Sequence, residues 1–414
     1  MNDLFSSLDW IDTQLARMVE FVTTWSGINT GSHHLPGLEH FAITLATEFG
    51  PLGGAMEMID LPAQEIIDGN GRIACKKLGR AIRITKRTSA PCQVLLAIHY
   101  DTVFAADHHF QTATMLDSNT LRGPGVADAK GGLVVLLHAL LALERSDLAT
   151  KLGWEILLTP DEEIGSPGSS ELFTQAAERN DVGLVFEPAL PDGSLVGARK
   201  GSGNFTAIVT GRAAHAGRNP EMGRNAILAL ADFIVRVHAM PALFPGVTVN
   251  VGHIEGGGPV NIVPDLAIAR FNIRADSLDQ QHLAETRLQH ILTEINSQEG
   301  ITLKLHGCFT APPKLLDPAT VQLFEQFREC GRELKLALDW HPAGGVCDGN
   351  RLAAAGLPTI DTLGPRGGNL HSDTEYLLLD SLTERAKLTA LFLLKYAAGE
   401  MTAATPRHLR KGQS

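Results

Sequence analysis

The chain has 414 residues, of which 44% are hydrophobic and 20% are charged. This composition is typical of a folded globular protein with two or three domains. A formal net charge of -11 argues against nucleic-acid binding, which requires a basic surface. The N-terminus has no basic region before an apolar run, and no apolar stretch reaches about 18 residues, so we predict a cytoplasmic protein outside the membrane. The five cysteines show no C-x-x-C spacing, which argues against a disulfide framework or a thiolate zinc site.

In the first half of the chain, short apolar runs alternate with amphipathic segments of helical length. The predicted strands are 94–98, 154–158 and 184–186, and the predicted helices are 133–143 and 169–177. Strands that alternate with helices in this way are typical of an α/β fold.

The pattern changes at Gly201, where polar and apolar residues begin to alternate. Strands 204–210, 248–254 and 267–273 and helices 224–238 and 281–296 predict a separate α+β unit. After Ala311 the first pattern resumes with helix 321–334, strand 358–361 and helix 381–396. We therefore predict a discontinuous α/β domain of residues 1–200 and 312–414, with an α+β domain of residues 201–311 inserted into it. The tail after Glu400 is expected to be disordered.

Polar residues follow the predicted strands, at the edge where open α/β sheets usually place their sites. His99 and Asp101 end the first strand and are one residue apart, so in an extended chain both side chains point to one face. The Asp101 carboxylate can then accept the other ring N–H of His99, which is how a metal-binding histidine is oriented.

Further candidate residues come from four places along the chain. Asp128 lies in the Gly-rich turn GPGVADAKGG before a helix, where a carboxylate can reach two ions with its two oxygens. Glu162 and Glu163 follow the second strand, Glu187 follows the third, and His371 lies in the Gly-rich segment GGNLHSDTEY.

The count of charges predicts a metal site with two divalent ions. Asp128, Glu163 and Glu187 carry three negative charges, which two divalent cations and one hydroxide would neutralise. Buried and unpaired, these carboxylates would take up protons instead. Oxygen and imidazole ligands without thiolates fit zinc, with cobalt or manganese as substitutes. Glu162 is then free to act as general base, whereas Asp161 is interpreted as a solvated or helix-capping residue.

Six motifs carry a resemblance over nearly the whole chain, from about Val94 to Tyr376. The segments AIHYDTVFA, GPGVADAKGG, TPDEEIGSPGS, VFEPA, GRAAHAG and GPRGGNLHSDTEY, in that order, resemble the dizinc peptidase family of glutamate carboxypeptidase, acetylornithine deacetylase and succinyl-diaminopimelate desuccinylase. Aminoacylase and several dipeptidases belong to the same family. The resemblance implies a zinc-exopeptidase-like catalytic domain with an inserted lid or dimerisation domain.

The resemblance also implies a role for each candidate. His99 and Glu187 would bind one zinc, Glu163 and His371 would bind the other, and Asp128 would bridge the two ions. The resemblance also implies that the peptide bond between Asp128 and Ala129 is cis. Glu162 would be the catalytic base and Asp101 the partner of His99.

In the inserted domain, the resemblance assigns oxyanion stabilisation to His215, acting in the partner subunit's active site. It assigns substrate binding to Asn261 and Arg274, of which Arg274 suits a carboxylate. Glutamate-releasing relatives carry an arginine where this chain has His306, Gly307 and Cys308, so a preference for terminal glutamate is not expected.

Other residues of metal-binding or nucleophilic type lack acidic partners at strand ends. The pairs His33-His34 and His108-His109 are interpreted as surface residues, and Cys347 as a small loop residue rather than a nucleophile.

These observations together predict a homodimeric dizinc amidohydrolase of the carboxypeptidase or deacylase type. Its substrate would be an N-acyl amino acid or small peptide with a free carboxylate. The alternatives are an aminopeptidase or dipeptidase with the same metals, and a non-catalytic binding protein that kept the fold.

Overall fold

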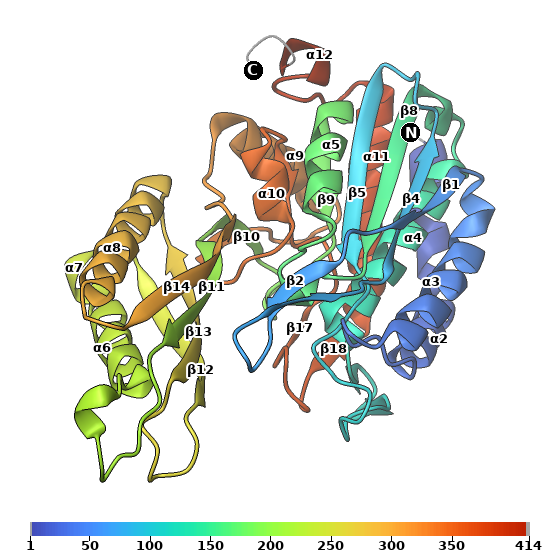
Figure 1. The fold of residues 1–414 in the computed structure, drawn as a ribbon. Coiled ribbons are helices and arrows are strands. Elements are labelled where there is room, and N and C mark those ends of the chain that lie inside the picture. Colours follow the sequence, from blue (N-terminus) through green and yellow to red (C-terminus); the bar gives the residue numbers. More distant parts are fainter. Residues whose placement is uncertain (1, 411–414) are drawn as a thin grey trace.

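A six-stranded sheet forms the centre of the larger of two structural units in the computed structural model, which describes residues 2–410 (Figure 1). The strand order is β1-β4-β8-β5-β9-β16; the last four strands run parallel, and β1 and β4 are antiparallel additions at one edge. The strands are β1 (Ala55–Asp60), β4 (Arg80–Lys86), β5 (Cys92–His99), β8 (Leu152–Thr159), β9 (Val182–Val185) and β16 (Thr359–Ile360).

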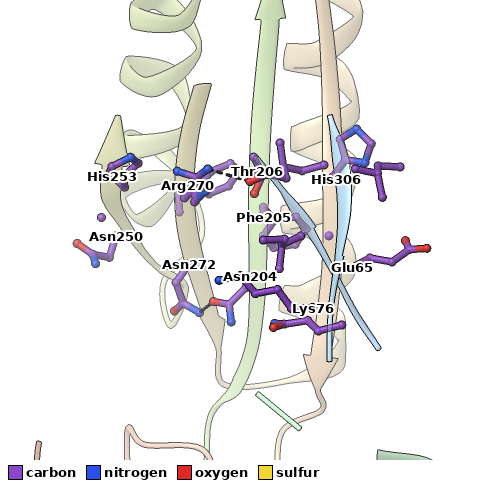
Figure 2. A pocket seen from close by; sticks show the side chains of 17 residues that line it. Glu65, Lys76, Asn204, Phe205, Thr206, Asn250, His253, Arg270, Asn272 and His306 are labelled. Atoms are coloured by element: carbon purple, nitrogen blue, oxygen red, sulfur yellow. Dashed lines mark hydrogen bonds between the residues drawn. The ribbon is translucent and has the colours of Figure 1, made fainter. Parts of the chain in front are cut away.

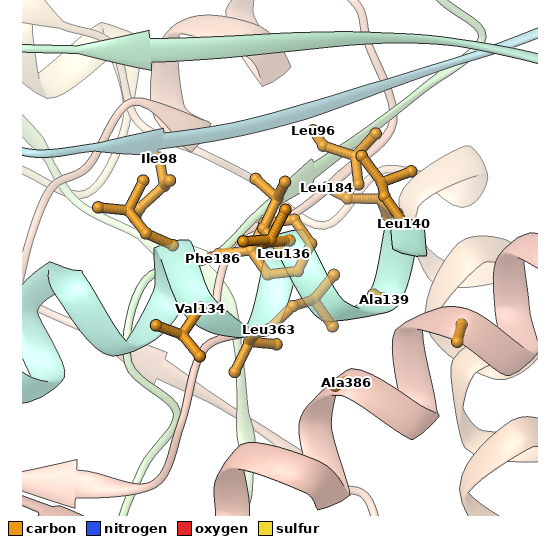
Figure 3. Packing of buried hydrophobic residues seen from close by; sticks show 14 of the residues in the cluster. Leu96, Ile98, Val134, Leu136, Ala139, Leu140, Leu184, Phe186, Leu363 and Ala386 are labelled. Atoms are coloured by element: carbon orange, nitrogen blue, oxygen red, sulfur yellow. The ribbon is translucent and has the colours of Figure 1, made fainter. Parts of the chain in front are cut away.

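Both faces of this sheet are covered by helices, so its central strands are apolar on both sides. Along β5, Leu96 and Ile98 point into the core beneath α4 (Gly132–Glu144), whereas Leu95 and Ala97 belong to the opposite core with α5 (Ser170–Arg179) and α10 (Gly349–Ala354). Figure 3 shows α4 lying between the sheet and α11 (Asp380–Ala398). Because α4 is enclosed on all sides, it is apolar around its whole circumference.

Further helices and short sheets complete the larger unit. The helices are α1 (Asn2–Asp12), α2 (Leu15–Ser26), α3 (Leu35–Phe49), α9 (Pro318–Glu333) and α12 (Arg407–Arg410). A hairpin consists of β2 (Gln64–Ile67) and β3 (Ile73–Lys76), and β10 (Leu195–Arg199) pairs with β15 (Trp340–Ala343). A small sheet beside the Gly-rich segments contains β6 (Thr114–Met115), β7 (Thr120–Arg122), β17 (Gly367–Gly368) and β18 (Tyr376–Leu378).

Residues 201–311 form the smaller unit, which has its own sheet and its own core (Figure 1). The strand order is β12-β13-β11-β14, all antiparallel. Its elements are β11 (Gly201–Thr210), α6 (Ala226–His238), α7 (Met240–Leu243), β12 (Thr248–Gly256), β13 (Leu266–Ala275), α8 (Leu278–Asn296) and β14 (Thr302–Ala311). Phe205, Ala207 and Val209 alternate along β11 into the core with the helices, and Asn204 and Thr206 face the opposite side.

The two segments that join the units are held by buried polar residues of the larger unit. Asp361 accepts hydrogen bonds from Arg199 Nε at 2.8 Å and from Lys314 Nζ at 2.9 Å. Asn350 donates through its side-chain amide to the carbonyl oxygens of Lys200 and Pro312, at 3.0 and 2.8 Å. Both crossing points are therefore tied to the same part of the larger unit.

Each strand and helix expected from the sequence is present, but the expected disorder after Glu400 is wrong as far as Arg410. Met401 is buried, and Arg407 in α12 donates to Asp181 through its backbone N–H at 2.8 Å and its guanidinium at 2.5 Å. This cation and carboxylate fix the tail on the larger unit. Residues 411–414 lie outside the described residues.

Two segments, Val126–Glu144 and Ala226–Leu243, are long and apolar enough by composition to cross a membrane. The first is 94% buried and is the core helix α4 with its preceding turn. The second, 33% buried, contains α6 and α7 and leaves an apolar face uncovered.

Candidate metal centre

The predicted ligands meet at the carboxyl edge of the central sheet because three of them follow adjacent parallel strands. His99 is the last residue of β5, Glu163 lies in the turn after β8, and Glu187 comes two residues after β9. Asp128 lies in the helical turn Val126–Gly131 before α4, and His371 lies between β17 and β18.

Asp128 is the centre of the cluster, since each of its oxygens faces a different imidazole. Its Oδ1 lies 3.0 Å from His99 Nε2, and its Oδ2 lies 3.2 Å from His371 Nε2. Each imidazole also faces a glutamate: His99 Nε2 lies 3.6 Å from Glu187 Oε2, and His371 Nε2 lies 3.1 Å from Glu163 Oε2. The five side chains thus form two groups of three that share Asp128.

Asp101 contacts both His99 and the turn that carries Glu162 and Glu163. Its Oδ1 lies 3.3 Å from His99 Nδ1, the ring nitrogen turned away from the cluster. The same carboxylate accepts the backbone N–H groups of Glu162 and Glu163, both at 3.2 Å, and the Ser32 hydroxyl at 2.7 Å. One buried carboxylate therefore orients the histidine and fixes the turn that carries the two glutamates.

The turn that carries Asp128 is held by Glu375, a residue that the sequence reasoning did not single out. The buried Glu375 carboxylate accepts the backbone N–H groups of Gly125, Ala127 and Asp128 at 3.0 to 3.2 Å. The sequence signal that could have identified Glu375 is its position in the motif HSDTEY, four residues after His371. The peptide bond between Asp128 and Ala129 is cis, as the resemblance implied.

A glycine allows this turn to approach the sheet. A Cβ on Gly132, at the start of α4, would lie 2.1 Å from the carbonyl oxygen of Phe186, far inside van der Waals contact. Only glycine permits the backbone to come so close. The approach brings Asp128 beside Glu187, the next residue after Phe186.

Burial makes the charged form of the glutamates unfavourable. Burial first, and the neighbouring Asp128 carboxylate second, raise the pKa of Glu163 to about 7. Burial also raises the pKa of Glu187, and it raises that of Glu162 well above its usual range with the help of Glu187. Without a cation, burial therefore favours the protonated form of these three carboxyl groups.

The imidazoles respond in the opposite direction because carboxylates surround them. Hydrogen bonds to Asp128 and Glu163 raise the pKa of His371 to about 11. Burial opposes the charged form of His99, yet Glu187, Asp101 and Asp128 together raise its pKa well above the usual value. A bound cation would displace these imidazolium protons, because histidine ligates as the neutral ring.

The donor set fits divalent ions. His99, Asp128 and Glu163 offer ligand atoms that all lie within 4.8 Å of one another. Among the described residues, Glu187 Oε1 is buried without a hydrogen-bond partner, which is costly unless a cation or another donor occupies its lone pairs. Imidazole and carboxylate donors without thiolate suit zinc, cobalt and manganese.

The structure leaves Glu162 outside the two groups of ligand atoms, although it lies beside them. Its backbone is fixed by Asp101, and its carboxyl group is close enough to Glu187 and His99 for both to influence its pKa. Glu162 shares its raised pKa with Glu163 and Glu187, so its position outside the two groups, and not its pKa, sets it apart from them.

The structure brings His215 and Asn261 together in the smaller unit, where the Ala216 N–H donates to the Asn261 carbonyl oxygen at 3.0 Å. His215 is exposed, and its Nδ1 accepts the backbone N–H groups of Gly217 and Arg218 at 3.1 and 3.2 Å. The neutral ring then carries its proton on Nε2, which is free to donate.

Arg274 lies apart from this pair, on β13. Its guanidinium donates to the Gly344 carbonyl oxygen at 2.6 Å and to Asn272 Oδ1 at 3.3 Å. It therefore bridges the smaller unit to a Gly-rich segment of the larger one.

A cavity of about 750 Å³ lies between the β2–β3 hairpin and the sheet of the smaller unit. Figure 2 shows Glu65 and Lys76 on the hairpin, opposite Asn204 and Asn272 on the sheet. This cavity contains none of the candidate ligands. A smaller cavity of about 410 Å³ is lined by Glu163 and therefore adjoins the metal centre.

The residues set aside by sequence reasoning have clear structural roles. Asp161 is not solvated: it is fully buried and accepts hydrogen bonds from the backbone N–H groups of Gly168 and Ser169, just before α5. Cys347 is buried and burial raises its pKa well above the usual range, so it is no activated thiolate.

The two histidine pairs differ in their surroundings. His109 is exposed and lies 3.3 Å from Asp373, and His33 is exposed as well. His34 and His108 are half-buried and bonded to their own loops: His34 Nδ1 lies 3.0 Å from Asn29 Oδ1, and His108 Nδ1 accepts the Phe110 N–H at 3.2 Å. The His34 contact holds the loop before α3.

Residues 95–395 match the model of a known family, described as peptidase family M20/M25/M40. The chain belongs to this family. Carboxypeptidase G2 from Pseudomonas sp. (strain RS-16) is 29% identical over 317 residues, which cover 74% of this chain and 74% of the relative. Succinyl-diaminopimelate desuccinylase from Rhodospirillum centenum is 27% identical over 294 residues, covering 67% of this chain and 74% of the relative.

Solved structures have the same fold. Human carnosine dipeptidase 1 aligns with a TM-score of 0.73 at 16% identity, covering 95% of this chain and all of the other. The M20 family metallo-carboxypeptidase Sso-CP2 from Sulfolobus solfataricus aligns with a TM-score of 0.71 at 17% identity, covering 92% of this chain and 99% of the other.

Membership of the family confirms three predictions: the α/β fold class, the family recognised from the six motifs, and a metal-dependent hydrolase of amide bonds. It implies divalent metal ions as cofactors and fits the cluster around Asp128.

Proposed function

We propose that this protein is a dizinc amidohydrolase that removes an amino acid with a free carboxylate from an N-acyl amino acid or a small peptide. One observation carries the proposal: the two oxygens of Asp128 face two separate histidine–glutamate pairs. His99 and Glu187 would hold one ion, and His371 and Glu163 the other, with Asp128 between them. Cobalt or manganese could replace zinc in the same donor set.

The ions, when bound, polarise the substrate carbonyl and make water a better nucleophile near neutral pH. We assign to Glu162 the transfer of a proton from the attacking water to the leaving amine. Asp101 keeps His99 and the Glu162–Glu163 turn in position. The role of His215 is to donate a hydrogen bond from Nε2 to the oxygen that gains negative charge in the transition state, a contact worth about 3 kcal/mol.

The proposal includes a homodimer in which residues 201–311 act as lid and dimerisation domain, and residues 1–200 with 312–414 act as the catalytic domain. Leu228 and Val235 on α6 are 67% and 69% exposed, and they form an apolar stripe beside the edge strand β12. A second copy would cover this stripe and pair with the edge. His215 would then reach the partner subunit's metal centre. We place the enzyme in the cytoplasm.

The substrate carboxylate is assigned to Arg274 and a neighbouring polar group to Asn261. Arg274 would have to exchange its contact with the Gly344 carbonyl for the substrate. The name of carboxypeptidase G2, one of the similar proteins, is that of an enzyme that cleaves beside a terminal carboxylate, which supports this assignment. Because the chain has His306, Gly307 and Cys308 at the end of the lid domain, we propose no preference for terminal glutamate.

Product analysis on a tripeptide tests this proposal against an aminopeptidase or a dipeptidase. The proposed carboxypeptidase releases the C-terminal amino acid, whereas an aminopeptidase releases the N-terminal one and a dipeptidase leaves the tripeptide intact. Chelation must abolish the activity and zinc or cobalt must restore it. Failure to hydrolyse any N-acyl amino acid or peptide with metal present would leave a binding protein as the better account.

Mixing two inactive variants tests the role of His215 across the interface. His215→Ala should reduce turnover by about 10² to 10³, and Glu162→Gln by about 10² to 10⁴. If His215 acts in the partner, their heterodimer contains one site with both residues intact and recovers part of the activity. A mixture with proven subunit exchange that stays as inactive as its parents would restrict His215 to its own chain.

A further inference from the structure

The cavity of about 410 Å³ beside Glu163 has no assigned role, although its size is within the range of small-molecule sites. Its walls are two loops of the catalytic domain and the turn after β8. The first loop contributes His33, the second contributes Val103, Ala105 and Ala106, and the turn contributes Ile164.

Hydrogen bonds hold the two loops together without a ligand. The Asn29 side-chain amide donates to the carbonyl oxygens of Phe104 and Ala105, both at 3.1 Å. The Thr102 N–H donates to the Thr30 carbonyl oxygen at 3.0 Å, and the Ser32 hydroxyl reaches Asp101. The cavity is therefore preformed, and its walls are joined to the residue that orients His99.

The charges of the lining decide what the cavity can hold. Among the described residues that line it, none is lysine or arginine, and Glu163 is the one carboxylate. With Glu163 neutralised by the proposed ion, a carboxylate placed deeper in the cavity would find no lysine or arginine in this lining to pair with, which is costly away from water. An uncharged apolar group would instead contact Val103, which is 41% exposed, together with Ile164 and the two alanines.

We propose that this cavity binds the acyl side of the scissile amide and selects an uncharged aliphatic acyl group of about four to six carbons over an acidic one. The inference rests on the proposed function and adds to it the class of acyl group. The position supports this assignment, because the cavity begins at Glu163 and lies in the catalytic domain, whereas the groups assigned to the carboxylate side, Asn261 and Arg274, lie in the lid domain. The exposed His33 imidazole, without a hydrogen-bond partner among the described residues, lies at the wall and can donate to a polar atom of the acyl group.

A matched pair of substrates tests the charge preference. The 4-methylpentanoyl and succinyl groups have nearly the same shape but differ in charge, and both are attached to the amino acid that is best accepted as its N-acetyl derivative. We expect kcat/KM to rise about fourfold per methylene from acetyl to pentanoyl. We expect kcat/KM for the 4-methylpentanoyl amide to exceed kcat/KM for the succinyl amide by at least about tenfold.

Variants of the cavity test its position. Val103→Arg should raise the ratio of kcat/KM for the succinyl amide to kcat/KM for the 4-methylpentanoyl amide by about tenfold, because it places a cation in the cavity. Ile43→Arg, the same kind of change on the exposed face of α3, should leave the ratio unchanged. Ala106→Leu fills the cavity and should lower kcat/KM for 4-methylpentanoyl at least tenfold, with acetyl changed less than twofold.

Calorimetry with the Glu162→Gln protein measures its affinity for each of the same amides. It therefore reports the acyl preference without turnover. The inference is overturned if hydrolysis proceeds equally for all acyl groups, if succinyl is preferred, or if Ala106→Leu affects acetyl as much as 4-methylpentanoyl. Absence of any hydrolysis would instead contradict the proposed function, and the order of affinities would still decide what the cavity binds.

Discussion

Replacing Asp101 by asparagine should loosen the metal centre without removing a single ligand. The carboxylate has no exposed surface and accepts three hydrogen bonds, from Ser32 and from the backbone N–H groups of Glu162 and Glu163. Its Oδ1 also lies 3.3 Å from His99 Nδ1, whose hydrogen bond is with the Asp101 carbonyl oxygen at 3.1 Å. Oδ1 accepts the Glu162 N–H, and Oδ2 accepts the Ser32 hydroxyl and the Glu163 N–H. An asparagine of the same shape has one oxygen and one NH₂ group, so the donors at one of the two positions must face another donor.

The size of the effect follows from these contacts. If the amide nitrogen replaces Oδ2, the Ser32 hydroxyl can rotate and accept, but the Glu163 N–H loses its acceptor. If it replaces Oδ1, the Glu162 N–H loses its acceptor and the NH₂ group faces His99 Nδ1, which keeps the Asp101 carbonyl oxygen as its partner. In either case one hydrogen bond to a charged group is lost, at about 1.5 to 3 kcal/mol. Loss of such a partner behind a metal-binding histidine typically lowers metal affinity by about 10- to 100-fold.

Chelator competition with zinc measures this loss, and thermal unfolding of the metal-free protein measures the change in stability. Asp117→Asn is the matched control, because Asp117 also accepts two backbone N–H groups but lies in an exposed turn. It should change neither quantity noticeably. A folded Asp101→Asn protein that binds zinc within threefold of the unchanged protein would refute the role given to Asp101.

Three further predictions concern other parts of the molecule. Glu162→Gln should reduce turnover by about 10² to 10⁴ while metal content stays unchanged; a loss of metal, measured by mass spectrometry, would make Glu162 a ligand instead. Burial lowers the pKa of His138, so below a pH of about 6.5 the unfolded chain binds more protons and stability falls as the pH falls. His138→Leu should therefore lose less stability between pH 7 and 5 in denaturant titrations, and equal slopes would contradict this. Leu228→Asp should produce monomers that bind zinc but turn over poorly, and an unchanged dimer in sedimentation would remove α6 from the proposed interface.

The strands and helices that were predictable have strong and simple patterns. The run that becomes β5 is buried on both faces, and a glycine-rich turn precedes the long apolar run that becomes α4, so both could be recognised without tertiary information. β14 was missed because His306, Gly307 and Cys308 interrupt its apolar alternation. Gly307 has a positive φ of 98°, and a Cβ there would lie 2.1 Å from the Asn204 carbonyl oxygen.

The candidate ligands could be found because each follows a strand or lies in a marked motif, whereas their supports could not. Glu375 and Ser32 contact Asp128 and Asp101 across 247 and 69 residues of sequence, and nothing local reports such contacts. Of the two interpretations of Asp161, solvation is wrong, because its buried carboxylate accepts backbone N–H groups seven and eight residues further along the chain, just before α5. The anchoring of the tail by Arg407 on Asp181 likewise depends on residues 226 positions apart.

Anomalous diffraction at the zinc edge tests the central claim most directly. In crystals grown with zinc, the account predicts two peaks per chain on either side of Asp128, about 3.5 to 4 Å apart. One should lie beside His99 and Glu187, and the other beside His371 and Glu163. A single peak, or a peak that leaves Asp128 bound to one ion only in a fully active protein, would contradict it.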